Sequence, residues 1–355
     1  MSQLRSYYAN SALYIKPVDD SGAYDFVHGI QSASDSFDLP ADYLLEWGQV
    51  GLFQAVDGIA DVTFDCEKLI DGSTPLYLAA TEGSTGAGLT ARSEKRCSIA
   101  VGIYPSDQEY VTGTPTRVIE YSGLQPTNIS YSFTVDGPFT ETMSFLGSYA
   151  EWTDGGSKYG SIPTNPTSSG ADVPLALTAC SGGIQFKQHL DFTGTYPTLL
   201  PTFIPGITSS GTMPFSGGCP IVPVQSINVS VDLTRNTIPQ LGCKTPYARL
   251  AQFPVDVTTD IEVLSQSGHG LEVTLAGSVL DGCEYTNAPS SRIRIKTRSG
   301  LYIDLGSQNK LTSAKQTYGD TGGSNATYTL SFTNKSVMSV YHDNDPSSIV
   351  YSGNP

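Results

Sequence analysis

The sequence has few charged residues and no long apolar run, and each absence excludes a class of protein. Charged residues make up 15% of the 355 residues, against about a quarter in average globular proteins. Lys and Arg number 19 against 34 Asp and Glu, a formal net charge of −15, whereas a protein that grips nucleic acid by its phosphates needs a basic surface. No run approaches about 18 apolar residues and the start has no signal-peptide core, so we expect neither a membrane span nor export by that route.

Metal, disulfide and catalytic motifs are also missing. The cysteines are scattered, without a CxxC pair or a histidine at ligand spacing, so buried or half-buried free thiols in a reducing cytoplasm are expected. These cysteines are Cys66, Cys97, Cys180, Cys219, Cys243 and Cys283. The four histidines lie far apart, and no GxSxG, HExxH, P-loop or GxGxxG motif occurs. We therefore expect no catalytic site, no metal and no cofactor.

Turn-forming and strand-forming residues are abundant instead. The chain holds 36 Gly, 22 Pro and 20 Tyr, and it is rich in Ser and Thr. Aromatic and β-branched residues favour strands, while Gly and Pro favour the turns that join them. The composition predicts an all-β protein.

A long segment of the sequence occurs twice. Residues 30–69 and 224–264 share three features in the same order. Each begins with apolar-Gln-Ser, continues to an Asp-Leu pair, and ends on Asp-Val-Thr-x-Asp-x-Glu-x-Leu. Each copy also has a Gly at the same distance after its Asp-Leu, at Gly48 and Gly242. Shared order at this length indicates duplication.

The repeat resumes further on and predicts two tandem β-domains of the sandwich or barrel type. Thr140–Phe145 and Thr327–Phe332 share the pattern Thr-x-Thr-apolar-Ser-Phe, each after a Gly- and Asp-rich turn that predicts a hairpin. Between the copies lies a Gly/Ser/Pro-rich stretch typical of linkers. We predict a first domain over 1–152, a linker over 153–177 and a second domain over 178–355.

Alternation along the repeated segments predicts one apolar and one polar face, because successive side chains of a strand point to opposite sides. The predicted polar set is Ser32, Ser34, Ser36, Asp61, Asp65 and Glu67 in the first copy, and Ser226, Asn228, Ser230, Asp256, Asp260 and Glu262 in the second. Any antiparallel sheet with one solvated side alternates in this way. Both copies, however, keep an acidic row with almost no Lys or Arg, whereas exposed faces usually mix signs.

Three further segments carry local predictions. Thr74 and Pro75 fit the N-cap and first position of a short helix, present only in the first copy. The Gly-rich stretch 82–96 that follows is expected to be a mobile loop. A basic run is either the solvated face of a strand or a contact with an acidic neighbour. It comprises Arg292, Arg294, Lys296 and Arg298.

The runs VQSINVSVDL and LGCKTPYARLAQFPVDVTTDIEV, with their first-copy counterparts and YSFTVDGPFTETMSFLG, resemble the tail-tube proteins of bacteriophages. The resemblance covers roughly 30–146 and 224–333. It implies a structural, non-enzymatic protein of the virion tail, assembled in the host cytoplasm. Its rings would stack through loops and termini into a channel for DNA, which passes without specific binding. It also implies tape-measure, tail-terminator and baseplate or tip proteins as partners, with a sheath as a further one.

A doubled chain departs from the family's usual ring of six single domains and implies three chains in pseudo-sixfold symmetry. Within that ring the twelve polar residues would line the channel. Two other classes stay open: another virion or secretion-tube protein, such as a tail terminator or decoration protein, and a carbohydrate-binding β-sandwich. In the latter, aromatic residues would form the binding platform, namely Tyr7, Tyr8, Trp47 and Trp152.

Overall fold

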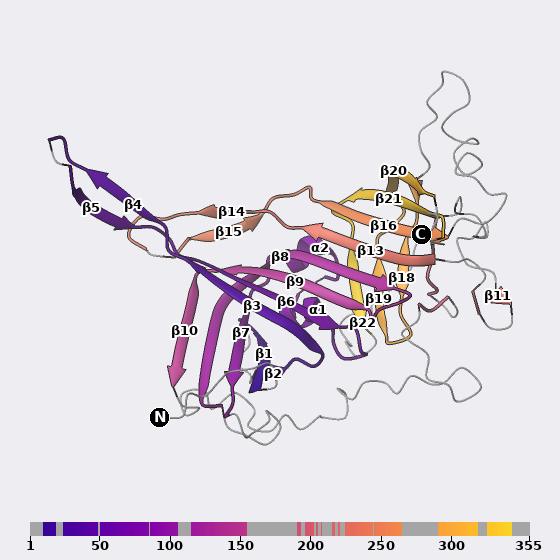
Figure 1. Ribbon diagram of the computed structural model, residues 1–355, viewed down its shortest axis with the longest axis horizontal. Coiled ribbons are helices and arrows are strands. Elements are labelled where there is room, and N and C mark those ends of the chain that lie inside the picture. Colours follow the sequence, from indigo (N-terminus) through magenta and orange to yellow (C-terminus); the bar gives the residue numbers. More distant parts are fainter. Residues whose placement is uncertain are drawn as a thin grey trace.

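The computed structural model confirms an all-β protein (Figure 1). The structure describes residues 10–18, 24–48, 50–84, 86–105, 115–154, 190–192, 196–201, 204, 207, 215–216, 219–220, 224–243, 245–264, 290–318 and 325–342. Among these, the helices are two short ones, α1 (Leu76–Ala80) and α2 (Leu89–Ser93).

Strands occupy most of the rest. The first half contains β1 (Ser11–Pro17), β2 (Asp25–Phe26), β3 (Ile30–Asp38), β4 (Ala41–Leu45), β5 (Leu52–Asp57), β6 (Asp61–Leu69), β7 (Cys97–Ile103), β8 (Arg117–Thr134), β9 (Thr140–Gly147) and β10 (Tyr149–Asp154). The second half contains β11 (Phe215–Ser216), β12 (Cys219–Pro220), β13 (Val224–Asp232), β14 (Arg235–Ile238), β15 (Ala248–Ala251), β16 (Asp256–Leu264), β17 (Ser290–Ser291), β18 (Arg294–Lys296), β19 (Leu301–Asp304), β20 (Asn309–Thr317), β21 (Thr327–Lys335) and β22 (Ser339–His342).

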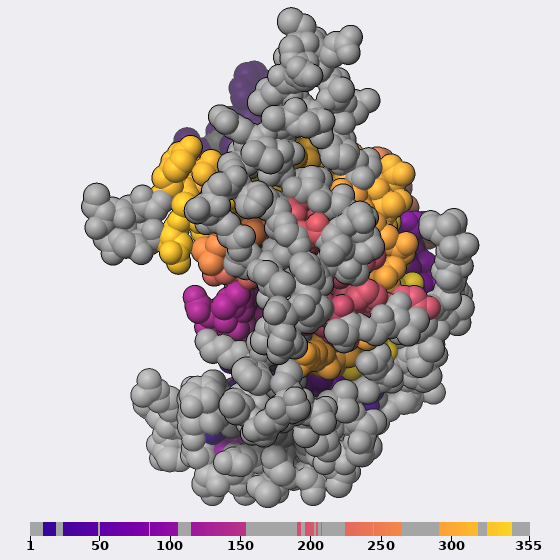
Figure 2. All heavy atoms as spheres, turned by 90° about the vertical axis from the view of Figure 1, so that its right-hand side faces the viewer, coloured from indigo at the N-terminus to yellow at the C-terminus, as the bar shows by residue number. Residues whose placement is uncertain are grey.

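The two copies build the same antiparallel arrangement and join into one sheet. The first copy has the strand order β3-β6-β9-β8, and the second has β13-β16-β21-β20. Strand β8 then pairs with β13 along its other edge, so that eight strands of both copies are continuous within a 13-stranded sheet. We call the β8–β13 pairing the internal seam (Figure 1). In the space-filling view of Figure 2, magenta atoms of the first copy lie beside orange atoms of the second.

Matching irregularities show that the equivalence holds residue by residue. A β-bulge lies between Ile30 and Ser32 in the β3–β6 pair and between Val224 and Ser226 in the β13–β16 pair. A bulge adds one unpaired residue to a strand, so its position fixes the register on both sides. The expectation that segments 30–69 and 224–264 fold alike is confirmed.

The β8–β9 and β20–β21 pairs are bulged at the same place as well. The skipped residues are Thr127 and Thr312, and each hydroxyl donates to the carbonyl of the serine it faces, Ser144 or Ser331, at 3.1 Å. The repeated turn glycines also agree, since Gly48 and Gly242 have φ of 91° and 84°. Only glycine adopts such backbone angles at little cost.

A second layer packs under each half of the sheet. In the first copy it consists of β10, β7, β1 and β2 with the start of β8, whose 18 residues run through both layers. In the second copy it is the three-stranded sheet β18-β19-β22. The two-layer arrangement covers the apolar face of the main sheet.

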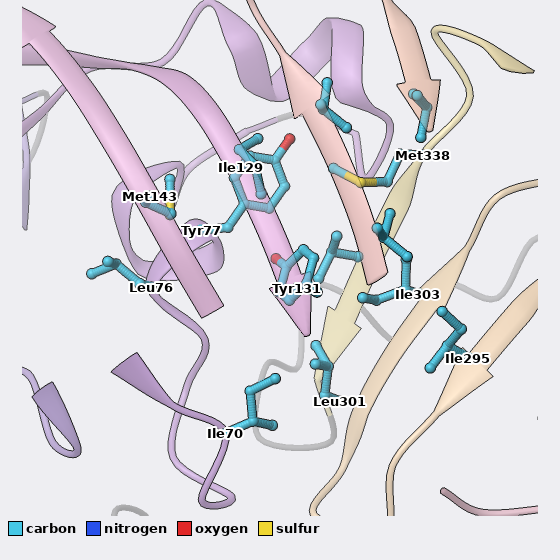
Figure 3. Close-up of a cluster of buried hydrophobic side chains, with 14 of the residues drawn as sticks. Ile70, Leu76, Tyr77, Ile129, Tyr131, Met143, Ile295, Leu301, Ile303 and Met338 are labelled. Carbon is cyan, nitrogen blue, oxygen red and sulfur yellow. The ribbon is translucent and has the colours of Figure 1, made fainter. Parts of the chain in front are cut away.

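One hydrophobic core runs through both copies. Figure 3 shows Ile129, Tyr131 and Met143 of the first copy in one cluster with Ile303 and Met338 of the second. The copies therefore share a core as well as a sheet. The predicted linker begins too early, because Thr153 and Asp154 belong to β10, and the rest of it, 155–177, lies outside the described residues. The predicted domain limits are otherwise untested.

The short helix of the first copy is confirmed, but its predicted cap is wrong. Helix α1 begins at Leu76 after Pro75, without a side-chain cap from Thr74. The carboxylate of Glu141, fully buried on β9, instead accepts the amide hydrogens of Leu76 at 2.6 Å and Tyr77 at 3.0 Å. It also accepts the Tyr131 hydroxyl at 2.9 Å. The second copy has Tyr328 at the equivalent position, and its described residues contain no such helix.

Two local predictions are corrected by packing. The stretch 82–96 is not a loop throughout, because it contains α2, whose Leu89, Arg92 and Ser93 are buried. Cys66 and Cys97 are free and buried, as expected, but Cys243 is exposed. Burial raises the pKa of both buried thiols.

The basic run is a solvated face only in part, because Arg292 and Arg298 are exposed. Arg294 is buried and lies over the rings of Tyr196 and Tyr302. Its neighbours pair with acids: Arg292 with Asp304 at 2.9 Å, and Lys296 with Asp191 at 3.3 Å. For Arg292, Arg294 and Lys296 the second interpretation, contact with an acidic neighbour, is confirmed, and the neighbour is in the same chain.

Candidate functional site

The polar side chains of both copies lie on one face of the eight-stranded sheet. Directly opposite residues of paired strands share a face. One unbroken row crosses all eight strands from β3 to β20: Ser32, Glu67, Thr142, Ser130, Ser230, Thr258, Thr333 and Lys310. We call this side of the sheet the polar face.

All twelve predicted residues belong to the polar face. In the first copy Ser32, Ser34 and Ser36 stand opposite Glu67, Asp65 and Thr63, while Asp61 stands opposite Asp38. In the second copy Ser226, Asn228 and Ser230 stand opposite Glu262, Asp260 and Thr258, while Asp256 stands opposite Lys335. These twelve side chains are half-buried or exposed. The structure therefore brings the two predicted sets together on one surface.

The other face is apolar and buried, as the alternation predicts. Val62 and Phe64 are 1% and 2% exposed, and Val257 and Ile261 are fully buried. The polar face is thus fixed by the burial of its opposite side. A shift of one residue in register would bury the carboxylates and expose the core.

Hydrogen bonds tie the polar face together across the internal seam and beside it. The Ser132 hydroxyl on β8 donates to the Asn228 side-chain oxygen on β13 at 2.8 Å. Next to the seam, Ser230 and Thr258 share a hydrogen bond of 2.6 Å. These contacts hold short polar side chains in place without adding positive charge.

The expectation that the acidic rows are nearly free of Lys and Arg needs correction. Asp61 forms an ion pair with Arg249 of β15, and Asp256 pairs with Lys335 of β21. Two further lysines, Lys310 and Lys315, stand on the polar face of β20. Carboxylates still outnumber lysines there: Asp38, Asp61, Asp65, Glu67, Asp232, Asp256, Asp260 and Glu262 against Lys310, Lys315 and Lys335. Sequence reasoning missed these cations because they lie on other segments.

Strand β3 differs from its counterpart β13 in being exposed on both faces. Phe37 is 43% exposed and Leu39 is 63% exposed, whereas the equivalent Val231 and Leu233 are 1% and 0% exposed. Among the described residues β3 pairs with β6 alone, while β13 pairs with β16 on one side and β8 on the other. The open edge of β3 explains the difference.

Two equivalent hairpins extend from the sheet in the same direction (Figure 1). Hairpin β14–β15 lies against the first copy through Arg235, whose guanidinium donates to the carbonyls of Pro126 and Ser93 at 2.7 Å. Hairpin β4–β5 projects furthest and carries large exposed apolar side chains. These are Tyr43, Leu44, Leu45, Trp47, Val50, Leu52, Phe53 and Val56.

Two of the four aromatic residues expected in a carbohydrate-binding platform, Trp47 and Trp152, lie in the part of the chain that the structure describes. Trp47 lies in the turn of β4–β5 and Trp152 on β10, where it contacts Phe37, while Tyr7 and Tyr8 lie outside the described residues. In the part of the chain that the structure describes, no three His, Cys, Asp or Glu side chains gather as a metal site. Neither described helix is long and apolar enough to cross a membrane.

Comparisons with known proteins give distant structural matches. No protein-family model and no curated protein matches the chain. Among solved structures, the chain is similar to the tube-terminating cap of the anti-feeding prophage, with 12% identity, a TM-score of 0.32, and coverage of 43% of this chain and 94% of that one. It is also similar to a chain of the anti-feeding prophage baseplate, with 10% identity, a TM-score of 0.30, and coverage of 43% and 98%.

Proposed function

We propose that the protein is a structural, non-enzymatic subunit of a bacteriophage tail tube. The observation that carries the proposal is the continuous sheet of two repeated halves, with one polar, mainly acidic face. Repeating this unit around an axis closes the sheet into a ring and removes its open edges. Three chains would supply six equivalent halves.

In the proposed ring the polar face lines the central channel. DNA must pass along such a wall without adhering, and a surface of Ser, Thr and carboxylates attracts no phosphates. The lysines Lys310, Lys315 and Lys335 stand among acidic and hydroxyl side chains. The wall therefore keeps an excess of negative charge.

Stacking of rings needs contacts outside the sheet. Hairpins β4–β5 and β14–β15 support this part of the proposal because they extend beyond the sheet and end in apolar side chains. Trp47, Val50 and Leu241 are 103%, 106% and 104% exposed. Exposed apolar clusters of this kind mark contact surfaces in soluble proteins.

Electron microscopy of the purified protein tests the assembly. Stacked rings with threefold symmetry and a central channel are the expected result. Isolated capsomer-like particles, or a sixfold ring of whole chains, would contradict the proposal.

A charge-reversal variant tests the face. We expect Asp65→Lys, Asp260→Lys and Glu262→Lys together to leave folding nearly intact. Asp65 is exposed and the other two are half-buried at the surface of the sheet, and surface substitutions usually cost about 0.5 kcal/mol or less each. Tubes of this variant should retain DNA in a salt-sensitive manner. The matched control reverses three exposed carboxylates away from the polar face, Asp25, Glu94 and Asp136. If both variants retain DNA equally, the polar face does not line the channel.

A further inference from the structure

The internal seam provides a template for the contact between chains. We infer that the free edge of β20 pairs with the free edge of β3 of a second copy, in the register of β8 with β13. This inference rests on the proposed ring and specifies its interface residue by residue.

The edge of β20 resembles that of β8 in its pairing: a short strand pairs with the start of each one. At its start β20 pairs with β17 through Asn309 and Ser291, at the position where β8 pairs with β7 through Leu124 and Cys97. Beyond Lys310 no described strand pairs with this edge of β20. On β8 the corresponding stretch is the one that binds β13.

The register follows from the two pairs of matching bulges. In the internal seam Ser130, Ser132 and Asn128 face Ser230, Asn228 and Asp232. Transfer to the equivalent strands places Lys315 opposite Ser36, Thr317 opposite Ser34, and Ser313 opposite Asp38. On the core side it places Tyr318 opposite Ala33 and Ala314 opposite Phe37.

The transferred pairs are complementary. Two of the three core-side pairs combine one aromatic ring with one alanine, and both rings, Phe37 and Tyr318, are exposed in the single chain. The third places Asp35 opposite Gln316, whose amide can donate to a carboxylate. In the internal seam the Leu233 amide donates to the Thr127 carbonyl at 2.7 Å, which predicts a bond from Leu39 to Thr312 of the second copy. Leu39 would then be buried as Leu233 is.

Cysteine cross-linking tests the register. Opposite residues of antiparallel strands have Cα atoms about 4.5–5.5 Å apart, within reach of a disulfide. In a Cys243→Ser background, Ser36→Cys with Lys315→Cys should give reducible species of two and three chains. Ser130→Cys with Ser230→Cys is the positive control, which should cross-link within one chain. Ser34→Cys with Ser313→Cys is the negative control, since these positions would be about 13 Å apart.

The outcomes separate this inference from the proposed function. The register would be overturned if micrographs show tubes and the positive control cross-links, but the Ser36→Cys with Lys315→Cys variant gives no cross-link between chains. An equally strong cross-link from the negative control would overturn it as well. Cross-linked chains that never form stacked rings would support the register and contradict the tube function. Monomers without a cross-link at every concentration would overturn both.

Discussion

Replacing Leu39 by alanine should weaken assembly and leave the single chain folded. Leu39 is 63% exposed in the single chain, whereas its counterpart Leu233 is fully buried at the internal seam. Full burial of a leucine stabilises by about 1.5–3 kcal/mol, so covering the exposed part contributes about 1–2 kcal/mol per contact between chains. This corresponds to a roughly tenfold weaker contact for Leu39→Ala, since 1.4 kcal/mol is tenfold.

The matched variant is Leu233→Ala, which should destabilise the chain itself by about 2–5 kcal/mol. Light scattering against concentration measures assembly, and thermal unfolding measures the chain. Val18→Ala, at a 40% exposed position of the first-copy second layer, controls for loss of an exposed apolar group. The reasoning fails if Leu39→Ala assembles at the wild-type concentration, or if it lowers chain stability as much as Leu233→Ala does.

Two further predictions concern the helix cap and the hairpin. Glu141→Ala leaves three buried donors without an acceptor and should lower the free energy of unfolding in denaturant by about 3–5 kcal/mol. The control Glu67→Ala, on the polar face, should change this free energy little. Equal decreases for the two variants would contradict the capping role of Glu141. Burial raises the pKa of the Glu141 carboxyl from 4.5. Between pH 4.5 and the raised pKa, the folded chain therefore keeps a proton that the unfolded chain releases. Its contribution to stability is therefore highest below pH 4.5 and is lost as pH rises through the raised pKa, and Glu141→Gln should remove that slope. Trp47→Ser should leave rings intact but shorten tubes in micrographs, with Glu46→Gln as control; unchanged tube length would exclude the hairpin tip from stacking.

Much of the fold could be predicted from the sequence because strand faces depend on local alternation. All twelve polar positions fall on one face, since Val62, Phe64 and their counterparts must be buried on the other. The equivalence of Gly48 with Gly242 was also visible, because a positive φ leaves few alternatives to glycine. These features depend on neighbours in sequence.

What the sequence did not reveal depends on partners far along the chain. Arg249 reaches Asp61 from another hairpin, and Glu141 caps a helix 64 residues earlier. Alternation alone places Glu141 on the core side of β9, where a carboxylate is unexpected without partners. The burial of Arg294 over the rings of Tyr196 and Tyr302 escaped prediction for the same reason.

The differences between β3 and β13 follow from when each edge is covered. The internal seam forms as the chain folds, so β13 can carry Ile227 and Val229 on its core side, both fully buried. In the proposed ring the edge of β3 stays open until a second chain pairs with it, and this edge carries Ala33 and Asp35 at the same positions. An inward-pointing charge and small side chains keep an open edge from pairing indiscriminately. Duplication thus lets one copy of the interface be strongly apolar, because tethering makes it intramolecular. In the proposed ring the other copy of the interface is selective for an edge whose register matches Phe37 and Leu39.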